Sequence, residues 1–267
     1  MSVADAWAVR RESSGRYTAT VHPGWDIAGA TDGGYLMAMT AQAVLAETGR
    51  TDPVTMTAHY LEPARPGPVV VDVQTLRSGR HRTAAAARLL SGEGRLLLSS
   101  LAVAGEQACT SEQAAPLVSD GTPPSLPPPE RCALVEPTQG FPPPFMGRVR
   151  LRLHPEDAGI FAGRPSGTAL MRGWFALGEQ EPLSSTSVLL AADSFPPPVF
   201  NADLPVSWTP TVELTVHVRA RPVGVWLACA FRTRFVSGGY LEVDGELWDS
   251  TGRLVALSRQ LALVPRG

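Results

Sequence analysis

Apolar and polar residues alternate with a period of two along many short stretches of the chain, which is typical of strands with one buried face. The stretch at residues 211–219 shows the alternation clearly. Its apolar positions are Val212, Leu214, Val216 and Val218, and its polar positions are Thr211, Glu213, Thr215, His217 and Arg219. The pattern predicts a strand whose apolar row packs against a helix, with Thr211 and Glu213 together on the opposite face.

The same arrangement occurs twice in the chain. Residues 55–66 align with residues 211–222, each segment beginning with Thr and ending in Ala-Arg-Pro. Residues 94–100 align with residues 252–258, each beginning Gly-Arg-Leu, with an offset two residues larger that a hairpin can absorb. A helix is predicted before each strand run, at residues 34–48 and at about residues 184–193. The repeating unit is therefore one helix followed by a meander of strands.

A proline-rich stretch separates the two copies. It contains the runs Pro123-Pro124, Pro127-Pro128-Pro129 and Pro142-Pro143-Pro144 and shows little periodicity. Such runs favour a stiff, extended linker. We expect an N-terminal module at residues 1–105, a linker at residues 106–144 and a C-terminal module at residues 145–267.

A sheet wrapped around one helix leaves exposed strand edges, and pairing two such sheets edge to edge covers them. We therefore predict an α+β chain with the double hot-dog fold. In this fold two tandem modules, each one helix and one antiparallel meander, form one continuous sheet. Two ordinary α+β modules in tandem are the alternative.

Composition and charge narrow the class of protein. The 267 residues are 44% hydrophobic and 18% charged with a formal net charge of −2, which indicates a globular protein without long-range attraction to nucleic acid or anionic membranes. No apolar run approaches the roughly 20 residues of a spanning helix, and the first residues lack the pattern of a signal peptide. We expect a cytoplasmic protein. Its three cysteines, Cys109, Cys132 and Cys229, are widely spaced and are interpreted as reduced thiols.

Several catalytic classes lack their motifs here. The chain contains no nucleophile elbow, HExxH, P-loop or dinucleotide fingerprint. Its five histidines, His22, His59, His81, His154 and His217, show no ligand spacing, so we predict neither a metal nor a cofactor.

The predicted first helix opens with Thr31-Asp32-Gly33-Gly34-Tyr35. Free backbone N–H groups at a helix start can polarise a carbonyl oxygen, and glycines leave them uncovered. The alternative is a glycine-rich turn in which Asp32 caps the helix.

The two halves differ where chemistry is expected. The second helix ends Leu190-Ala191-Ala192-Asp193, whereas the matching position in the first helix is Ala41. The second helix in turn begins near Ser185-Thr186, without a glycine pair. Single hot-dog thioesterases carry both features on one helix. This chain divides them, and it resembles the type II acyl-CoA thioesterases, in which an Asp ending the second helix, a Thr opening the next strand and a Gln in the last strand form the site. These fall on Asp193, Thr211 and Gln260.

The resemblance implies a hydrolase of lipid metabolism that acts on acyl-CoA and forms homo-oligomers, with coenzyme A present only as part of the substrate. Asp193 would orient or deprotonate a water, Thr211 and Gln260 would hold that water, and the backbone at Gly33 and Gly34 would bind the thioester oxygen, without a covalent intermediate. Glu213 is the alternative base, because it is predicted to share a face with Thr211.

One departure from the family keeps other functions open. The Asp-His pair that follows the family's Thr reads Glu213-Leu214 here. A hydratase or dehydratase of enoyl-CoA that uses His59 or His217 is one alternative. A catalytically inactive acyl-CoA-binding or scaffold protein is the other.

Overall fold

The computed structural model describes residues 3–107, 118–138, 141–178, 181–202 and 204–264. Cys109 lies outside these ranges, while Cys132 and Cys229 are buried and unpaired. No helix within the described ranges is long and apolar enough to cross a membrane.

The first half is a helix wrapped by strands, as predicted. Its elements are η1 (Ala4–Trp7), β1 (Arg10–Ser13), β2 (Arg16–Val21), β3 (Asp26–Ile27), β4 (Ala30–Thr31), α1 (Gly33–Thr48), β5 (Asp52–Tyr60), β6 (Gly67–Ser78), β7 (Arg82–Ser91) and β8 (Leu96–Gly105). Helix α1 begins one residue before the predicted start and ends at Thr48, and the following Gly49 has the left-handed backbone that favours glycine after a helix. The predicted first helix is confirmed.

The second half repeats the plan with a shorter helix. Its elements are η2 (Pro129–Arg131), β9 (Ala133–Leu134), η3 (Pro144–Gly147), β10 (Val149–Leu153), η4 (Ala158–Ala162), β11 (Leu170–Leu177), α2 (Ser187–Ala191), η5 (Pro198–Ala202), β12 (Thr211–Val218), β13 (Leu227–Arg232), β14 (Val236–Ser237), β15 (Tyr240–Trp248) and β16 (Leu254–Leu263). The prediction of a helix at residues 184–193 was too long. Ser184 caps the N–H of Ser187, and the prolines after Phe195 prevent continuation.

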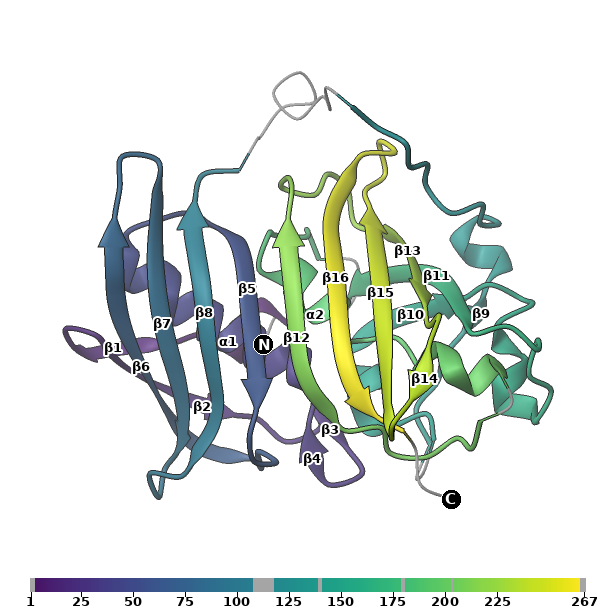
Figure 1. Ribbon diagram of the computed structural model, residues 1–267, viewed down its shortest axis with the longest axis horizontal. Coiled ribbons are helices and arrows are strands. Elements are labelled where there is room, and N and C mark those ends of the chain that lie inside the picture. The colour runs from purple at the N-terminus through teal and green to yellow at the C-terminus, as the bar shows by residue number, and fades with distance from the viewer. Residues whose placement is uncertain (1–2, 108–117, 139–140, 179–180, 203, 265–267) are drawn as a thin grey trace.

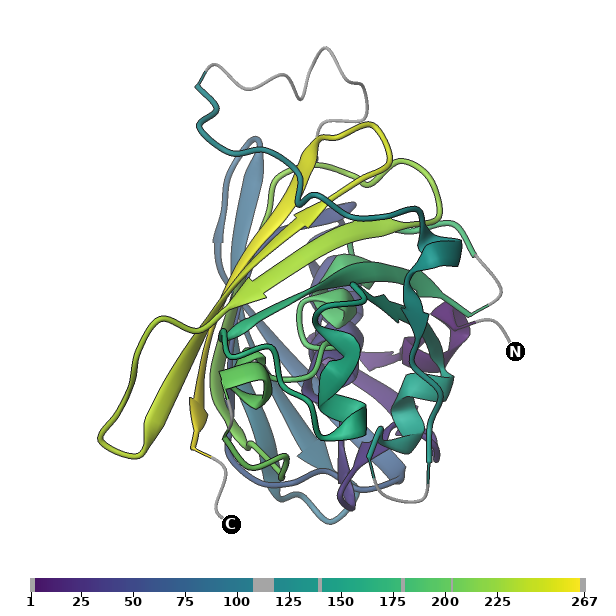
Figure 2. The same cartoon turned by 90° about the vertical axis from the view of Figure 1, so that its right-hand side faces the viewer.

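One continuous antiparallel sheet joins the halves (Figure 1). Among the described residues it contains fourteen strands, ordered β1-β2-β6-β7-β8-β5-β12-β16-β15-β13-β11-β10-β9 with β14 beside β15. The halves meet where β5 pairs with β12, with Leu214 opposite Ala58 and Val216 opposite Met56. The helices gather on one side of the curved sheet (Figure 2). The double hot-dog fold is confirmed.

A β-bulge changes the face on which Thr211 lies. Thr211 pairs with Ala262 and Glu213 with Leu261, so Val212 is an extra residue in β12. An extra residue reverses the alternation of side chains across a bulge. Thr211 therefore faces the interior, while the Glu213 carboxylate accepts a hydrogen bond from Thr215 on the other face. The prediction that Thr211 and Glu213 share a face was wrong, and with it the basis for Glu213 as a base.

Candidate functional site

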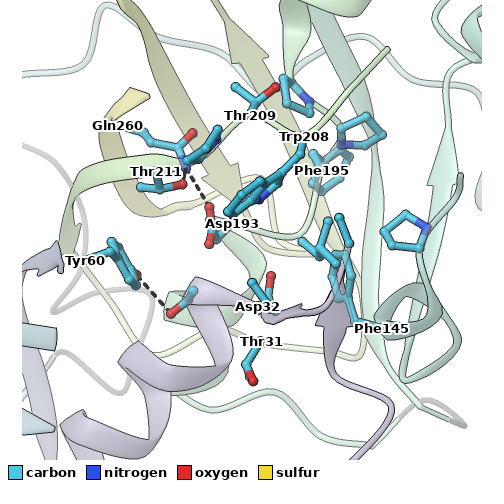
Figure 3. Close-up of a pocket in the computed structure, with 18 of the residues that line it drawn as sticks. Thr31, Asp32, Tyr60, Phe145, Asp193, Phe195, Trp208, Thr209, Thr211 and Gln260 are labelled. Atoms are coloured by element: carbon cyan, nitrogen blue, oxygen red, sulfur yellow. Dashed lines mark hydrogen bonds between the residues drawn. The ribbon is translucent and has the colours of Figure 1, made fainter. Parts of the chain in front are cut away.

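A cavity of about 630 Å³ lies where the start of α1, the end of α2 and the sheet come together. Residues from both halves line it, including Gly33, Asp193, Thr211 and Gln260 (Figure 3). Both halves contribute to this cavity, as the sequence indicated by placing the glycine pair on the first helix and the acid on the second.

Three of the predicted site residues form one hydrogen-bonded chain. The Gln260 Nε2 atom donates to Asp193 Oδ1 at 2.7 Å and to Thr211 Oγ1 at 2.7 Å. The Gly34 backbone N–H donates to Asp193 Oδ2 at 2.9 Å. The structure thus brings together the helix start of one half and the acid, hydroxyl and amide of the other.

The glycine pair lies in close contact with Asp193, and Gly34 also packs against the backbone of α2. A Cβ atom on Gly33 would lie 2.7 Å from Asp193 Oδ2, and one on Gly34 would lie 2.9 Å from both Asp193 Cβ and the Leu190 carbonyl oxygen. The Gly34 N–H is already used by Asp193. The N–H of Gly33 donates to no acceptor within the described part of the chain, and Gly33 lines the cavity.

The Asp193 carboxyl is a weaker acid than an ordinary aspartate. Loss of solvent raises its pKa to about 7, while hydrogen bonds from Gly34 and Gln260 oppose the rise by stabilising the carboxylate. A carboxyl with a pKa near neutrality is well suited to accept a proton at neutral pH.

Asp32 is a second buried carboxyl beside Asp193. Its Oδ1 accepts from the Tyr35 N–H at 2.8 Å, which confirms the helix cap, and its buried Oδ2 has no partner among the described residues. Burial and the charge of Asp193 raise the pKa of Asp32 well above its usual range. The direction of this shift favours the neutral form of the Asp32 carboxyl beside an ionised Asp193. Sequence reasoning identified the cap but not this proximity.

Asparagine should replace Asp32 with little effect, because it keeps the capping oxygen and matches a neutral carboxyl. We expect Asp32→Asn to retain kcat within about threefold, and Asp32→Ala to lower the free energy of unfolding by about 1 kcal/mol or more through the lost cap. Steady-state kinetics and urea denaturation measure the two effects. A loss of kcat in Asp32→Asn as large as that in Asp193→Asn would contradict a neutral Asp32.

Tyr60, at the end of β5, is a site residue that sequence reasoning missed. Its hydroxyl donates to the Gly33 carbonyl oxygen at 2.9 Å. That carbonyl and the Gly34 N–H belong to the same peptide unit, so Tyr60 orients the group that holds Asp193. Burial and nearby acids raise the pKa of Tyr60 well above its usual range, which keeps the hydroxyl a donor.

We expect Tyr60→Phe to lower kcat by about five- to tenfold, because one neutral hydrogen bond contributes about 1 kcal/mol. The weaker Gly34 donor should also raise the pKa that limits activity on the acid side. A pH–rate profile measures both changes, and Tyr240→Phe, at an exposed position of β15, is the control. An unchanged profile in Tyr60→Phe would remove Tyr60 from the positioning of Asp193.

The other candidate groups lie outside the cavity. His59 and His217 are exposed on the sheet, and neither lines the cavity. Of the described residues, His154, Glu156 and Asp157 form a group with the spacing of metal ligands. The Arg172 guanidinium already bonds both carboxylates there, at 2.8 and 2.9 Å.

Two family models match the chain. The model of the acyl-CoA thioesterase N-terminal domain matches residues 21–105, and that of the acyl-CoA thioesterase C-terminal domain matches residues 129–264. An uncharacterised protein of Mycobacterium tuberculosis is 26% identical, with 90% of this chain and 88% of the relative covered.

Solved structures are similar over nearly the whole chain. A protein of Thermobifida fusca assigned as a thioesterase II has a TM-score of 0.88 and 32% identity, with 100% of this chain and 98% of that chain covered. A hot-dog protein of unknown function from Alicyclobacillus acidocaldarius has a TM-score of 0.83 and 22% identity, covering 99% and 98%. An acyl-CoA thioesterase II from Mycobacterium marinum, at 15% identity and a TM-score of 0.68 over 99% and 98%, shares the fold.

Proposed function

Because the chain belongs to the acyl-CoA thioesterase family, we propose that it hydrolyses an acyl-CoA thioester with a water molecule activated directly by Asp193. The observation that carries this proposal is the half-buried Asp193 carboxylate, held by Gly34 and Gln260 on the wall of a largely apolar cavity. The carboxylate supplies a base, and Gly34 and Gln260 hold that base in position.

Gln260 and Thr211 have complementary roles in holding the water. The Gln260 amide hydrogens point to Asp193 and Thr211, which leaves its Oε1 as an acceptor. The Thr211 oxygen accepts from Gln260, so its own hydrogen is available to donate to a water oxygen. A water between Oε1, the Thr211 hydroxyl and Asp193 would be oriented for loss of a proton to the carboxylate.

The Gly33 N–H is the donor we assign to the thioester oxygen. It lies at the positive end of α1, where backbone N–H groups stabilise negative charge. Gly34, the other glycine considered for this role, is the donor that positions Asp193.

The reaction balances without a covalent intermediate. Asp193 takes a proton from water as the hydroxide oxygen bonds to the thioester carbon. The tetrahedral intermediate then breaks its C–S bond, and the coenzyme A thiolate takes the proton from Asp193. Among the described residues that line the cavity there is no cysteine and no histidine to activate a serine.

The decisive experiment measures free thiol released from acyl-CoAs of increasing chain length. We expect release from at least part of this series. Tight binding without release would instead favour the scaffold function. Water addition to an enoyl-CoA with the thioester intact would favour the hydratase, although His59 and His217 lie away from the cavity.

The pH dependence of hydrolysis should follow the ionisation of the Asp193 carboxyl. Protonated Asp193 cannot accept a proton from water, so we expect kcat/KM to rise with pH through an apparent pKa of about 7. Initial rates at saturating and limiting substrate measure the profile. A profile that is level from about pH 5 to about pH 8 would contradict the role of Asp193 as the base.

A further inference from the structure

The wall of the cavity is apolar beyond the reacting end. Aromatic rings and prolines from both halves supply much of it, among them Phe145, Phe195, Pro197, Phe200, Trp208 and Phe231. Phe195 and Phe231 pack against each other with ring centroids 4.8 Å apart. In Figure 3, Phe145 and Phe195 lie to the right of Asp32 and Asp193, and the Trp208 ring is drawn beside Asp193. An apolar acyl group that replaces water here gains about 0.8 kcal/mol for each buried CH₂.

The described residues of this wall that can carry a charge at neutral pH are all acidic. Four acids, Asp26, Asp32, Glu62 and Asp193, line the cavity, and the described lining residues include no arginine, lysine or histidine. Glu62 has an arginine partner, Arg95, at 3.4 Å, where both side chains are about half exposed. Asp26 on β3 and Asp193 therefore place carboxylates on this wall without a basic residue among the described residues that line it.

A carboxylate at the far end of an acyl chain would meet two unfavourable terms. It would lose its hydration in an apolar cavity, and it would approach fixed negative charges with no cation to pair with. A methyl group at the same position meets neither. Resting on the proposed thioesterase function, we propose that this site accepts uncharged, apolar acyl groups and excludes the CoA thioesters of dicarboxylic acids.

Hexanoyl-CoA and adipoyl-CoA are the matched probes, because their six-carbon acyl groups differ in that the last carbon is a methyl in one and a carboxylate in the other. We expect kcat/KM for hexanoyl-CoA to exceed that for adipoyl-CoA by at least about a hundredfold. Equal values, or a preference for adipoyl-CoA, would overturn the proposal.

Substitution of one acidic residue on the cavity wall tests whether the wall charges cause the selectivity. The ratio of kcat/KM for adipoyl-CoA to that for hexanoyl-CoA should increase from wild type to Asp26→Asn and again to Asp26→Arg. Asp120→Arg, at an exposed position away from the cavity, makes the same change in net charge and should leave the ratio unaltered. An equal increase in Asp120→Arg, or no increase in Asp26→Arg, would contradict selection by the cavity wall.

Binding separates this proposal from the thioesterase function. Ketone analogues of both probes, with a methylene in place of the thioester sulfur, bind without turnover and are measured by calorimetry on the wild-type protein. If no thiol is released from hexanoyl-CoA but its analogue binds at least about a hundredfold more tightly than the adipoyl analogue, hydrolysis fails and the selectivity stands. If both analogues bind equally, or neither binds, the selectivity fails.

Discussion

Asp193→Asn is expected to lower kcat by about a thousandfold, because an asparagine amide cannot accept the proton of the attacking water. The substitution keeps the size of the side chain and one oxygen, which serves one of the two donors, because Gly34 and Gln260 bond different oxygens of the carboxylate. KM should change by less than about threefold, since the missing interaction is made mainly in the transition state. Thiol release under single-turnover conditions measures the chemical step.

The control for this substitution is Asp244→Asn on β15, the strand beside that of Gln260. The Asp244 side chain bonds Arg234 and Arg259 and does not line the cavity. The Asp244→Asn variant should retain the wild-type kcat. If Asp193→Asn keeps kcat within tenfold while Asp244→Asn is also active, a group other than Asp193 activates the water.

Gly34→Ala is expected to lower the free energy of unfolding by about 3 kcal/mol, since overpacking a rigid contact costs this order of energy. The new Cβ would stand 2.9 Å from the Leu190 carbonyl oxygen and 3.1 Å from Leu190 Cα, both backbone atoms of α2. Helix propensity alone predicts the opposite sign, a gain of up to about 1 kcal/mol for alanine over glycine. Urea denaturation therefore separates the two effects by sign.

Gly121→Ala is the matched control, because its added Cβ meets only Trp248 ring atoms at 3.4 Å, an ordinary contact. Its free energy of unfolding should stay within about 0.5 kcal/mol of wild type. If Gly34→Ala were as stable as Gly121→Ala, the close approach of α1 and α2 would not be the reason for the glycine. Activity should fall in Gly34→Ala as well, because α2 must shift and carry Asp193 with it.

The local pattern of residues was sufficient for the elements and for their duplication. Side-chain alternation marks the strands because neighbouring residues point to opposite faces, and the apolar run after Gly33 marks α1. The paired landmarks in the two halves implied one sheet. The division of Gly33 and Gly34 from Asp193 implied a composite site, and the family resemblance supplied Thr211 and Gln260.

Tertiary structure decided which of these residues contact one another and in which direction their pKa values shift. The bulge at Val212 turns Thr211 inward, and no alternation pattern encodes it because it arises from pairing with β16. The bond of Asp193 to Gly34 and the bond of Tyr60 to Gly33 join residues distant in the chain. Burial raises the pKa of Asp32 and of Asp193, and the charge of Asp193 raises that of Asp32 further; both effects exist only once the halves have packed. Sequence determined which groups are present, whereas packing determined which of them meet in the cavity.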